Sequence, residues 1–185
     1  MPDNQIFKTV VALVEKDGSK PLQLAFGSRV VKPGDKIPKG EAQELPTLGW
    51  DTAAPDQKFV VLSLDLDAPF PSFAPLSPIL HWLQTGLVIG GSSSADGVAA
   101  AAAAAGQLTS PDPATAFWAG PGPPPISSPH RYIFLLYAQP PDFDARTITK
   151  ASGFGIRDRM RWDLSRFEKR AKLGTPVAAT YFLSN

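Results

Sequence analysis

The stretch FVVLSLDLDAP, residues 59–69, gives the clearest strand signal in the chain of 185 residues. Side chains of a strand alternate between two faces. Four apolar residues share one face here: Val60, Leu62, Leu64 and Leu66. If the strand stays regular over 59–67, Asp65 and Asp67 point together to the opposite face. We therefore expect a strand that gives one face to a core and brings two carboxylates close together.

Further strand signals occur before and after this stretch. They lie at residues 22–26, 80–88, 130–137 and 177–183, with a short apolar segment at 45–50 and a turn at 32–35. We also expect Phe7 to Val14 to form a buried strand. In the strand that begins at His130, alternation puts this imidazole on the same face as Tyr132.

Residues 157–173 have the spacing of a helix. Apolar residues recur three or four positions apart (Met160, Leu164, Phe167 and Ala171), and Gly174 and Pro176 then end the pattern. No alternation of strands and helices follows the chain, which excludes a parallel α/β fold. The fold class we predict is all-β dominated, a β-rich α+β fold: an antiparallel β-sandwich with one helix near the C-terminus.

The length and the apolar content predict a single domain over residues 1–185. The stretch at about 90–110 is an insertion of low complexity, rich in alanine, serine and glycine. We expect residues 91–108 to be mobile and removable, because this composition buries very little. The alternative is a mobile flap beside a pocket.

Composition narrows the environment and the partners. The chain has no cysteine, which rules out disulfides and thiol chemistry and suits a reducing compartment, so we expect a cytoplasmic protein. Residues 1–18 carry charges around a short apolar run and resemble neither a signal peptide nor a transmembrane segment. The net charge of +1 gives no reason to expect nucleic acid as a partner.

Basic residues are concentrated near the C-terminus. Residues 157–172 contain seven lysines and arginines and three acidic residues. One interpretation is a patch for phospholipid or another polyanion. The other is the solvated face of an amphipathic helix, which is the usual meaning of a single charge run.

The chain has only two histidines, and each lies in a distinctive motif. His81 belongs to LHWL at 80–83, and His130 belongs to PHRY at 129–132, shortly after GPGPP at 120–124. Two imidazoles, two carboxylates and a stiff Gly/Pro loop suit a small anion-binding or acid–base pocket. Each motif alone also has a plainer interpretation, as a turn cap, a buried histidine or a Pro-rich turn.

Taken in order, DLDAP, HWL, GPGPP and HRY resemble the motifs of the phosphatidylethanolamine-binding protein family, as does LGTPVAATYF at 173–182. The resemblance covers roughly residues 45–183, apart from the insertion. It implies a β-sandwich with a small anion pocket. Members of that family bind phospholipid head groups, inhibit proteases or kinases, or act as signalling scaffolds.

The resemblance assigns the ligand pocket to Asp65, Asp67, His81, Gly122, Pro124, His130 and Tyr132. If the protein is an enzyme, catalysis would fall to Asp65, His81, His130 and Tyr132. Imidazolium groups and a glycine amide can donate hydrogen bonds to a phosphate. We expect no metal and no cofactor, because the sequence has neither a tight metal-ligand motif nor a nucleotide-binding loop.

Departures from the family pattern make the mouth of the pocket more apolar. The common Asp-Pro-Asp has Leu66 in its middle position, and Ile126 stands where a glycine usually follows the Pro-Pro pair. The loop at 70–76 is apolar where relatives often carry arginines.

Two functions therefore stay open. The first is a ligand-binding protein with a small anion or phospholipid head-group pocket, acting as an inhibitor or regulatory protein on a phospholipid surface or a protein partner. The second is a cofactor-independent enzyme that isomerises, dehydrates or cyclises a small apolar natural product by proton transfer. For the first we expect at least one histidine to be charged at pH 7, because a neighbouring carboxylate raises the pKa of an imidazole.

Overall fold

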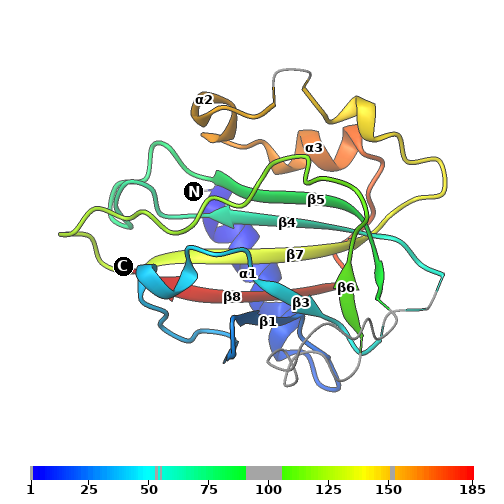
Figure 1. Ribbon diagram of the computed structural model, residues 1–185. Helices are drawn as coiled ribbons and strands as arrows, with labels where there is room; N and C mark the ends of the chain where they lie inside the picture. The colour runs from blue at the N-terminus through cyan, green and yellow to red at the C-terminus, as the bar shows by residue number, and fades with distance from the viewer. Residues whose placement is uncertain (1, 53, 55, 91–105, 151–152) are drawn as a thin grey trace.

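The computed structural model describes residues 2–52, 54, 56–90, 106–150 and 153–185. Within these residues it contains eight strands and a few short helices (Figure 1). The strands are hydrogen-bonded in the order β2-β1-β3-β6-β5-β4-β7-β8, and all neighbours are antiparallel. The β-rich antiparallel fold predicted from the sequence is therefore confirmed.

The short strands are β1 (Gln23–Phe26), β2 (Arg29–Val31), β3 (Thr47–Gly49) and β6 (Gln107–Thr109). The longer strands are β4 (Phe59–Asp65), β5 (Ile79–Ile89), β7 (His130–Ala138) and β8 (Ala178–Ser184). The α-helices are α1 (Pro2–Glu15), α2 (Ile156–Arg159) and α3 (Leu164–Arg170). Two 3-10 turns, η1 (Lys39–Ala42) and η2 (Ala145–Thr147), complete the elements.

Strand β5 joins the two layers of the sandwich. Most of its length pairs with β4, and its end, Val88 and Ile89, pairs with β6. The long sheet β5-β4-β7-β8 thus continues into the shorter sheet β6-β3-β1-β2. Side chains from both sheets form one buried core between them, with Leu24 and Leu48 from the short sheet and Phe134 from the long one.

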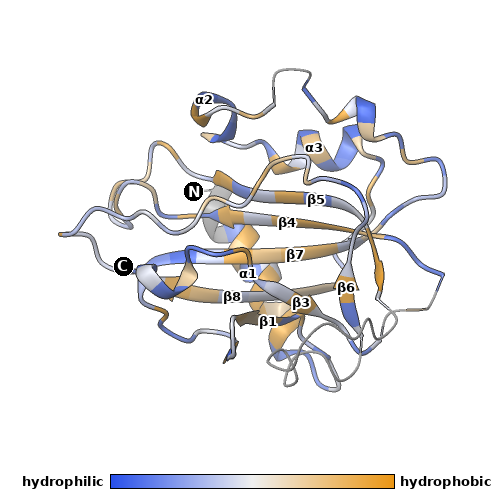
Figure 2. Cartoon of the chain, in the orientation of Figure 1, coloured by the Kyte–Doolittle hydropathy of each residue, from blue (hydrophilic) through white to orange (hydrophobic). Residues whose placement is uncertain are grey.

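A second core lies on the other face of the long sheet. The four alternating residues of β4 and its continuation, Val60, Leu62, Leu64 and Leu66, all belong to it. Val10 of α1 and Phe167 of α3 cover them, and Figure 1 shows α1 passing behind the strands. In Figure 2 hydrophobic residues accordingly run along the central strands. Every residue of β4 is buried, so this strand has core residues on both of its faces.

Strand β8 also binds the N-terminal part of the chain through hydrogen bonds and a ring contact. The amides of Leu22 and Ile37 donate hydrogen bonds to the carbonyl oxygens of Ala179 and Leu183, at 3.1 and 2.8 Å. The ring of Phe7 in α1 packs edge-on against Tyr181, with ring centroids 5.0 Å apart. Residues separated by most of the sequence therefore depend on each other.

The expected strand from Phe7 to Val14 is wrong, because these residues belong to α1. The buried residue Val10 and the half-buried Ile6, Leu13 and Val14 recur at a spacing of three to four, which is helical. A short apolar run fits either period, and here packing against β8 and β7 decides in favour of the helix.

The single helix expected over 157–173 is also a correction, because the chain forms α2 and α3 with a break between them. At the break Arg161 has a positive φ of 54°. The amides of Arg161 and Trp162 donate to the carbonyl oxygens of Leu76 and Pro78, at 2.9 and 2.8 Å, instead of continuing a helix. Asp163 then caps α3 by accepting from the amide of Arg166.

Most of the expected insertion, residues 91–105, lies outside the described residues. The end of that expected segment is part of the fold, however. Gln107–Thr109 forms β6 between β3 and β5, and Leu108 is buried in the core between the sheets. The expectation that the whole of 91–108 is mobile is therefore wrong for residues 107 and 108. Whether the segment can be removed stays a prediction.

Candidate functional site

Three adjacent strands bring the predicted site residues together where β4 ends and β7 begins. Asp65 is the last residue of β4 and pairs with Tyr132 of β7. His130 is the first residue of β7, two positions before Tyr132 on the same face. His81 lies on β5, on the other side of β4. All four side chains are buried.

A register shift singles out His81. Ser63 pairs with Trp82 and Leu64 pairs with Leu80, so His81 has no partner on β4. This is a β-bulge, and bulges re-aim a side chain at the cost of one place in the ladder. The bulge places the imidazole of His81 edge-on to the ring of Tyr132, with centroids 5.1 Å apart.

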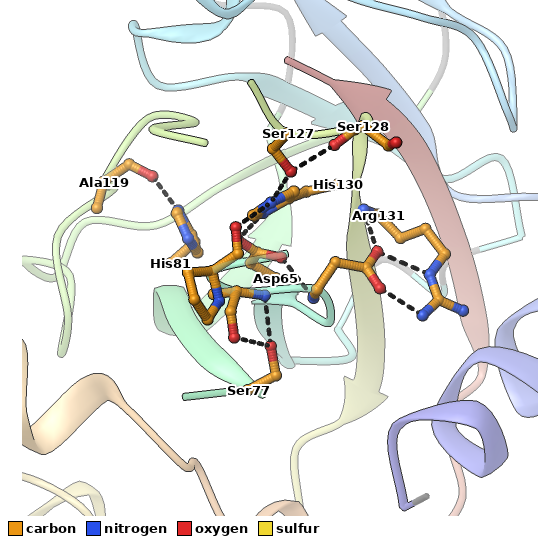
Figure 3. A network of polar contacts seen from close by, with 11 residues as sticks. Asp65, Ser77, His81, Ala119, Ser127, Ser128, His130 and Arg131 are labelled. Carbon is orange, nitrogen blue, oxygen red and sulfur yellow. Dashed lines mark hydrogen bonds and ion pairs between the residues drawn. The ribbon is translucent and has the colours of Figure 1, made fainter. Parts of the chain in front are cut away.

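His130 is held from both of its nitrogens (Figure 3). Its Nδ1 lies 2.9 Å from Oδ2 of Asp65. Its Nε2 lies 3.0 Å from Oγ of Ser127 and 3.1 Å from the carbonyl oxygen of Pro69. The hydroxyl of Ser127 donates to the carbonyl oxygen of Ser128, so it accepts from His130.

These contacts favour the charged form of His130. A carboxylate and a carbonyl oxygen accept hydrogen bonds but cannot donate them, so both contacts are hydrogen bonds only if each ring nitrogen of His130 carries a proton. Burial acts against this charge, but the hydrogen bond and the charge of Asp65, with a contribution from Asp67, raise the pKa of His130 above its usual value. The direction of this shift favours the charge expected for one histidine, which stays a prediction. The His130 side chain is only 1% exposed, and both of its ring nitrogens already have hydrogen-bond partners.

His81 has the opposite character. Its Nδ1 faces the carbonyl oxygen of Ala119 and therefore donates to it. Burial, assisted by the nearby positive charges of Arg159 and His130, lowers the pKa of His81 below its usual value despite the charge of Asp65. The neutral ring then has a bare Nε2 that has no hydrogen-bond partner among the described residues. This nitrogen is the free acceptor of the site.

Tyr132 stands between the two imidazoles. Its ring is roughly parallel to that of His130, with centroids 6.4 Å apart, while His81 approaches it edge-on. Its buried hydroxyl lies beside the Asp65 carboxylate and the amide of Gly122, with no hydrogen bond of full geometry to a described residue. Burial and the negative charge of Asp65 raise the pKa of Tyr132, so the phenol stays protonated and available as a donor.

Asp67 serves a different partner from Asp65. Strand β4 ends at Asp65, and the amide of Asp67 donates to Oδ1 of Asp65 at 2.8 Å. The Asp67 carboxylate accepts from Nε and Nη2 of Arg131 at 2.8 and 2.6 Å. The guanidinium also stacks 4.8 Å from the centroid of the Phe7 ring. The expected regular strand to residue 67 is therefore wrong, and Asp67 ties the site to α1.

The Gly/Pro loop encloses the site from the side of β5. Ala116 exchanges backbone hydrogen bonds with Leu83, and the amide of Ala119 donates to the carbonyl oxygen of His81 at 2.8 Å. Pro124 accepts from the amide of Ser127 at 2.9 Å, which forms the turn that presents Ser127 to His130. Gly122 is exposed, so of the predicted residues it lies nearest to solvent.

Arg159 holds this loop against β5. Its guanidinium donates to the carbonyl oxygens of His81, Leu80 and Phe117 at 3.2, 3.3 and 2.9 Å. The sequence placed it among the solvated charges of a helix, but it is partly buried, and burial lowers its pKa. Arg159 therefore fixes the backbone on both sides of the His81 ring.

Sequence reasoning missed four contributors: Trp118, Ala119, Ser127 and Arg159. Ala119 acts through its carbonyl, which no side-chain pattern reveals, and Arg159 is 78 positions from His81. Ser127 had a weak signal, because it lies between the Gly/Pro motif and His130. Trp118 packs 6.1 Å from the His81 ring.

Apolar side chains are exposed on the loops that carry the site. Phe73, Phe117 and Ile126 are 69%, 69% and 87% exposed. Among the described residues, no group of three His, Cys, Asp or Glu side chains is placed to hold a metal ion. In the same part of the chain, no helix is both long and apolar enough to cross a membrane.

The fold and this site define a β-sandwich protein with a buried Asp–His pair and a second, neutral histidine at one end of its long sheet. A family model described as phosphatidylethanolamine-binding protein matches residues 27–182. The chain belongs to this family.

Two similar proteins carry names that point to different roles. One is the phomoidride biosynthesis cluster protein N of Talaromyces stipitatus, 30% identical over 131 residues that cover 69% of this chain and 59% of the relative. Another is the carboxypeptidase Y inhibitor of Saccharomyces cerevisiae, 29% identical over 150 residues that cover 80% of this chain and 61% of the relative. The match thus spans about three fifths of the length of each relative.

Solved structures show the same fold. A carboxypeptidase Y inhibitor, crystallised in complex with its cognate proteinase, superposes with a TM-score of 0.71 at 19% identity, over 100% of this chain and 93% of the inhibitor chain. The phosphatidylethanolamine-binding protein of Plasmodium vivax gives a TM-score of 0.67 at 11% identity, over 100% and 96%. At these identities the likeness concerns the fold alone.

Proposed function

We propose that the protein is a ligand-binding protein whose pocket takes a small anionic group together with a proton. The observation that carries the proposal is the bare Nε2 of the neutral His81, beside a site in which each carboxylate already has its own cation. An added negative charge would be unbalanced unless His81 became an imidazolium. Protonated His81, the Tyr132 hydroxyl and the Gly122 amide would then donate to the anion.

Proton uptake gives the proposal a sharp test. The probe is sulfate, which does not titrate near neutral pH, and the measurement is calorimetry in two buffers of different ionisation enthalpy. We expect the protein to take up close to one proton for each sulfate bound above the lowered pKa of His81. The affinity should fall by up to tenfold for each pH unit, because the neutral ring is the competing state.

The matched variant is His81→Gln, which keeps an amide at the site but cannot take up a proton. We expect it to bind sulfate about 10- to 100-fold more weakly, since a hydrogen bond to a charged group contributes about 1.5–3 kcal/mol. Its remaining binding should no longer be coupled to the uptake of a proton by residue 81. Sulfate binding without proton uptake in the wild type would contradict the proposal.

A second candidate is an acid–base enzyme, and two observations favour it. The environment pushes the pKa values of His81 and His130 in opposite directions, which is how acid and base roles are separated. A relative at 30% identity is named for a biosynthesis cluster. In this candidate His81 acts as the base, while Asp65, His130 and Tyr132 set its electrostatics. The exposed apolar Phe73, Phe117 and Ile126 would accommodate an apolar substrate.

The enzyme candidate is tested by incubating the protein with small organic acids and apolar intermediates from such biosynthetic clusters, with and without chelator. We expect the His81→Gln variant to lose about 10²–10⁴-fold in rate, which is the usual contribution of a general base. Substrates that bind but come back unchanged would leave only the binding function.

Partners and location remain proposals as well. The inhibitor among the relatives suggests assaying carboxypeptidase inhibition by this protein, and vesicles containing phosphatidylethanolamine test the phospholipid surface. A cytoplasmic location stays a prediction that fractionation would check.

A further inference from the structure

A cavity whose lining contains neither histidine lies between α2, α3 and the segment after η2. Its volume is about 430 Å³, and the helices that form it stand at the top of Figure 1. Three aromatic side chains line it: Phe154, Trp162 and Phe167. Their rings pack in series, with centroids 5.7 Å apart in each of the two pairs. We call this space the α2–α3 cavity.

Positive charge surrounds this aromatic wall. Four basic residues line the α2–α3 cavity (Lys150, Arg161, Arg166 and Arg170), against the two carboxylates Asp158 and Asp163. Lys150 forms an ion pair with Asp158. The Asp163 carboxylate is occupied as the cap of α3. Figure 2 shows α2 and α3 carrying hydrophilic and hydrophobic residues side by side.

The three arginines keep their charge free for a ligand. Arg161 Nε donates to the carbonyl oxygen of Pro75 at 3.0 Å, and Arg170 donates to that of Thr147. Contacts with neutral carbonyl groups position a guanidinium but do not neutralise it. Arg166 is exposed, and its side chain forms no hydrogen bond or ion pair with a described residue. The cavity therefore has a net positive lining.

One further feature marks the α2–α3 cavity as more than a surface charge run. Arg161 is a non-glycine residue with a positive φ, a conformation that costs energy and is concentrated at functional sites. That conformation separates α2 from α3 and so opens the cavity.

We propose that the α2–α3 cavity binds a small amphiphilic anion, with an aromatic or compact aliphatic body against Trp162 and Phe167 and an acidic group on Arg161, Arg166 and Arg170. The site is separate from the histidine site, and the proposal does not depend on the function given to that site. This proposal differs from a solvated helix face because the arginines line the same cavity as the aromatic side chains of Phe154, Trp162 and Phe167. Arginine suits this role, because a planar guanidinium binds a phosphate or carboxylate through two hydrogen bonds.

The probe is 1-naphthyl phosphate, titrated by calorimetry and by tryptophan fluorescence. The comparison compounds are 1-naphthol, which lacks the acid, and inorganic phosphate, which lacks the body. We expect both to bind at least tenfold more weakly than 1-naphthyl phosphate. The variant is Arg166→Gln, because the free side chain of Arg166 makes it safe for folding. We expect about a 10- to 100-fold loss of affinity.

Lys169→Gln is the matched control, because it removes one exposed positive charge from the same helix without touching the cavity. We expect it to leave the affinity unchanged. All titrations use the His81→Gln background, in which anion binding at the histidine site is weakened, so that the signal reports on the α2–α3 cavity. Equal losses on adding Arg166→Gln or Lys169→Gln would indicate general electrostatic attraction and overturn the proposal. So would equal affinity for inorganic phosphate, or no binding of 1-naphthyl phosphate in this background.

Discussion

At the scale of single residues, the Asp65–His130 pair makes a stability prediction. Asp65→Asn leaves a buried imidazole without its counter-charge, and we expect a loss of about 3 kcal/mol at pH 6. Because Asp65 raises the pKa of His130, the pair's stabilisation is complete below the unfolded value of about 6.5 and is lost as pH rises through the folded pKa. The measurement is denaturant unfolding from pH 5 to 9.

The exposed Asp112→Asn serves as the control for this series. His81 acts in the opposite direction: its lowered pKa reduces stability as pH falls below about 6.5. The Asp65→Asn and His81→Gln variants should therefore change the two sides of the pH profile separately. A profile of the same shape in Asp65→Asn and wild type would argue against the charged pair.

Arg159 makes a second prediction at this scale, as a positioning residue. Arg159→Met removes the donors for four carbonyl groups, and we expect a loss of about 1–3 kcal/mol in stability. Removing its charge should also raise the pKa of His81, since that charge lowers it. NMR titration of the His81 ring measures the shift, and a merely structural role would not produce it. Arg157→Met, on the same helix but exposed, should leave the titration unchanged.

At this scale, motif order and strand alternation were enough to predict that Asp65, His81, His130 and Tyr132 lie together, as they do in the structure. It did not reveal that the two histidines hold different protonation states. Those states depend on the carbonyl oxygens of Ala119 and Pro69, which come from loops whose positions only the tertiary fold sets.

At the scale of elements, residues 7–14 were predicted to form a strand but belong to α1, and the two possibilities can be tested against each other. In α1, Val10 is buried and Ala12 is exposed, whereas a strand would place positions 10 and 12 on the same face. We expect Val10→Asp to lower the unfolding free energy by more than about 3 kcal/mol, because it buries an unpaired charge. Ala12→Asp should cost less than about 1 kcal/mol, which is close to the difference in helix propensity. Similar losses at both positions would indicate a strand.

The strands were predictable and the helices were less so, for a physical reason. The long strands carry period-two patterns or continuous apolar runs, and pairing with two neighbours fixes them. The break between α2 and α3 leaves the apolar spacing intact, because Leu164 and Phe167 pack on the sheet side in either case. What interrupts the helix is the pair of carbonyl oxygens at Leu76 and Pro78, and no local pattern encodes them.

At the scale of the whole molecule, β6 sets a limit to what can be removed. We expect a deletion of 91–109 to be less stable than a deletion of 91–105 by at least about 2–5 kcal/mol, the usual cost of losing one large buried side chain such as Leu108. The longer deletion also removes the strand that links β3 to β5. Thermal unfolding of the two proteins gives the comparison. Equal midpoints would show that β6 is not needed to close the short sheet.

The contacts that Phe7, Leu22 and Ile37 make with β8 also have a consequence for folding during translation. Residues 2–37 leave the ribosome before residues 178–184, yet the partners of Phe7, Leu22 and Ile37 lie in the later segment. At an elongation rate of ~5–20 residues per second, roughly 10–30 s pass between the two events. During that time the apolar face of the nascent N-terminal segment has no native surface to cover it. A chaperone that holds the emerging chain would therefore act on this segment, and its release would coincide with completion of the last strand.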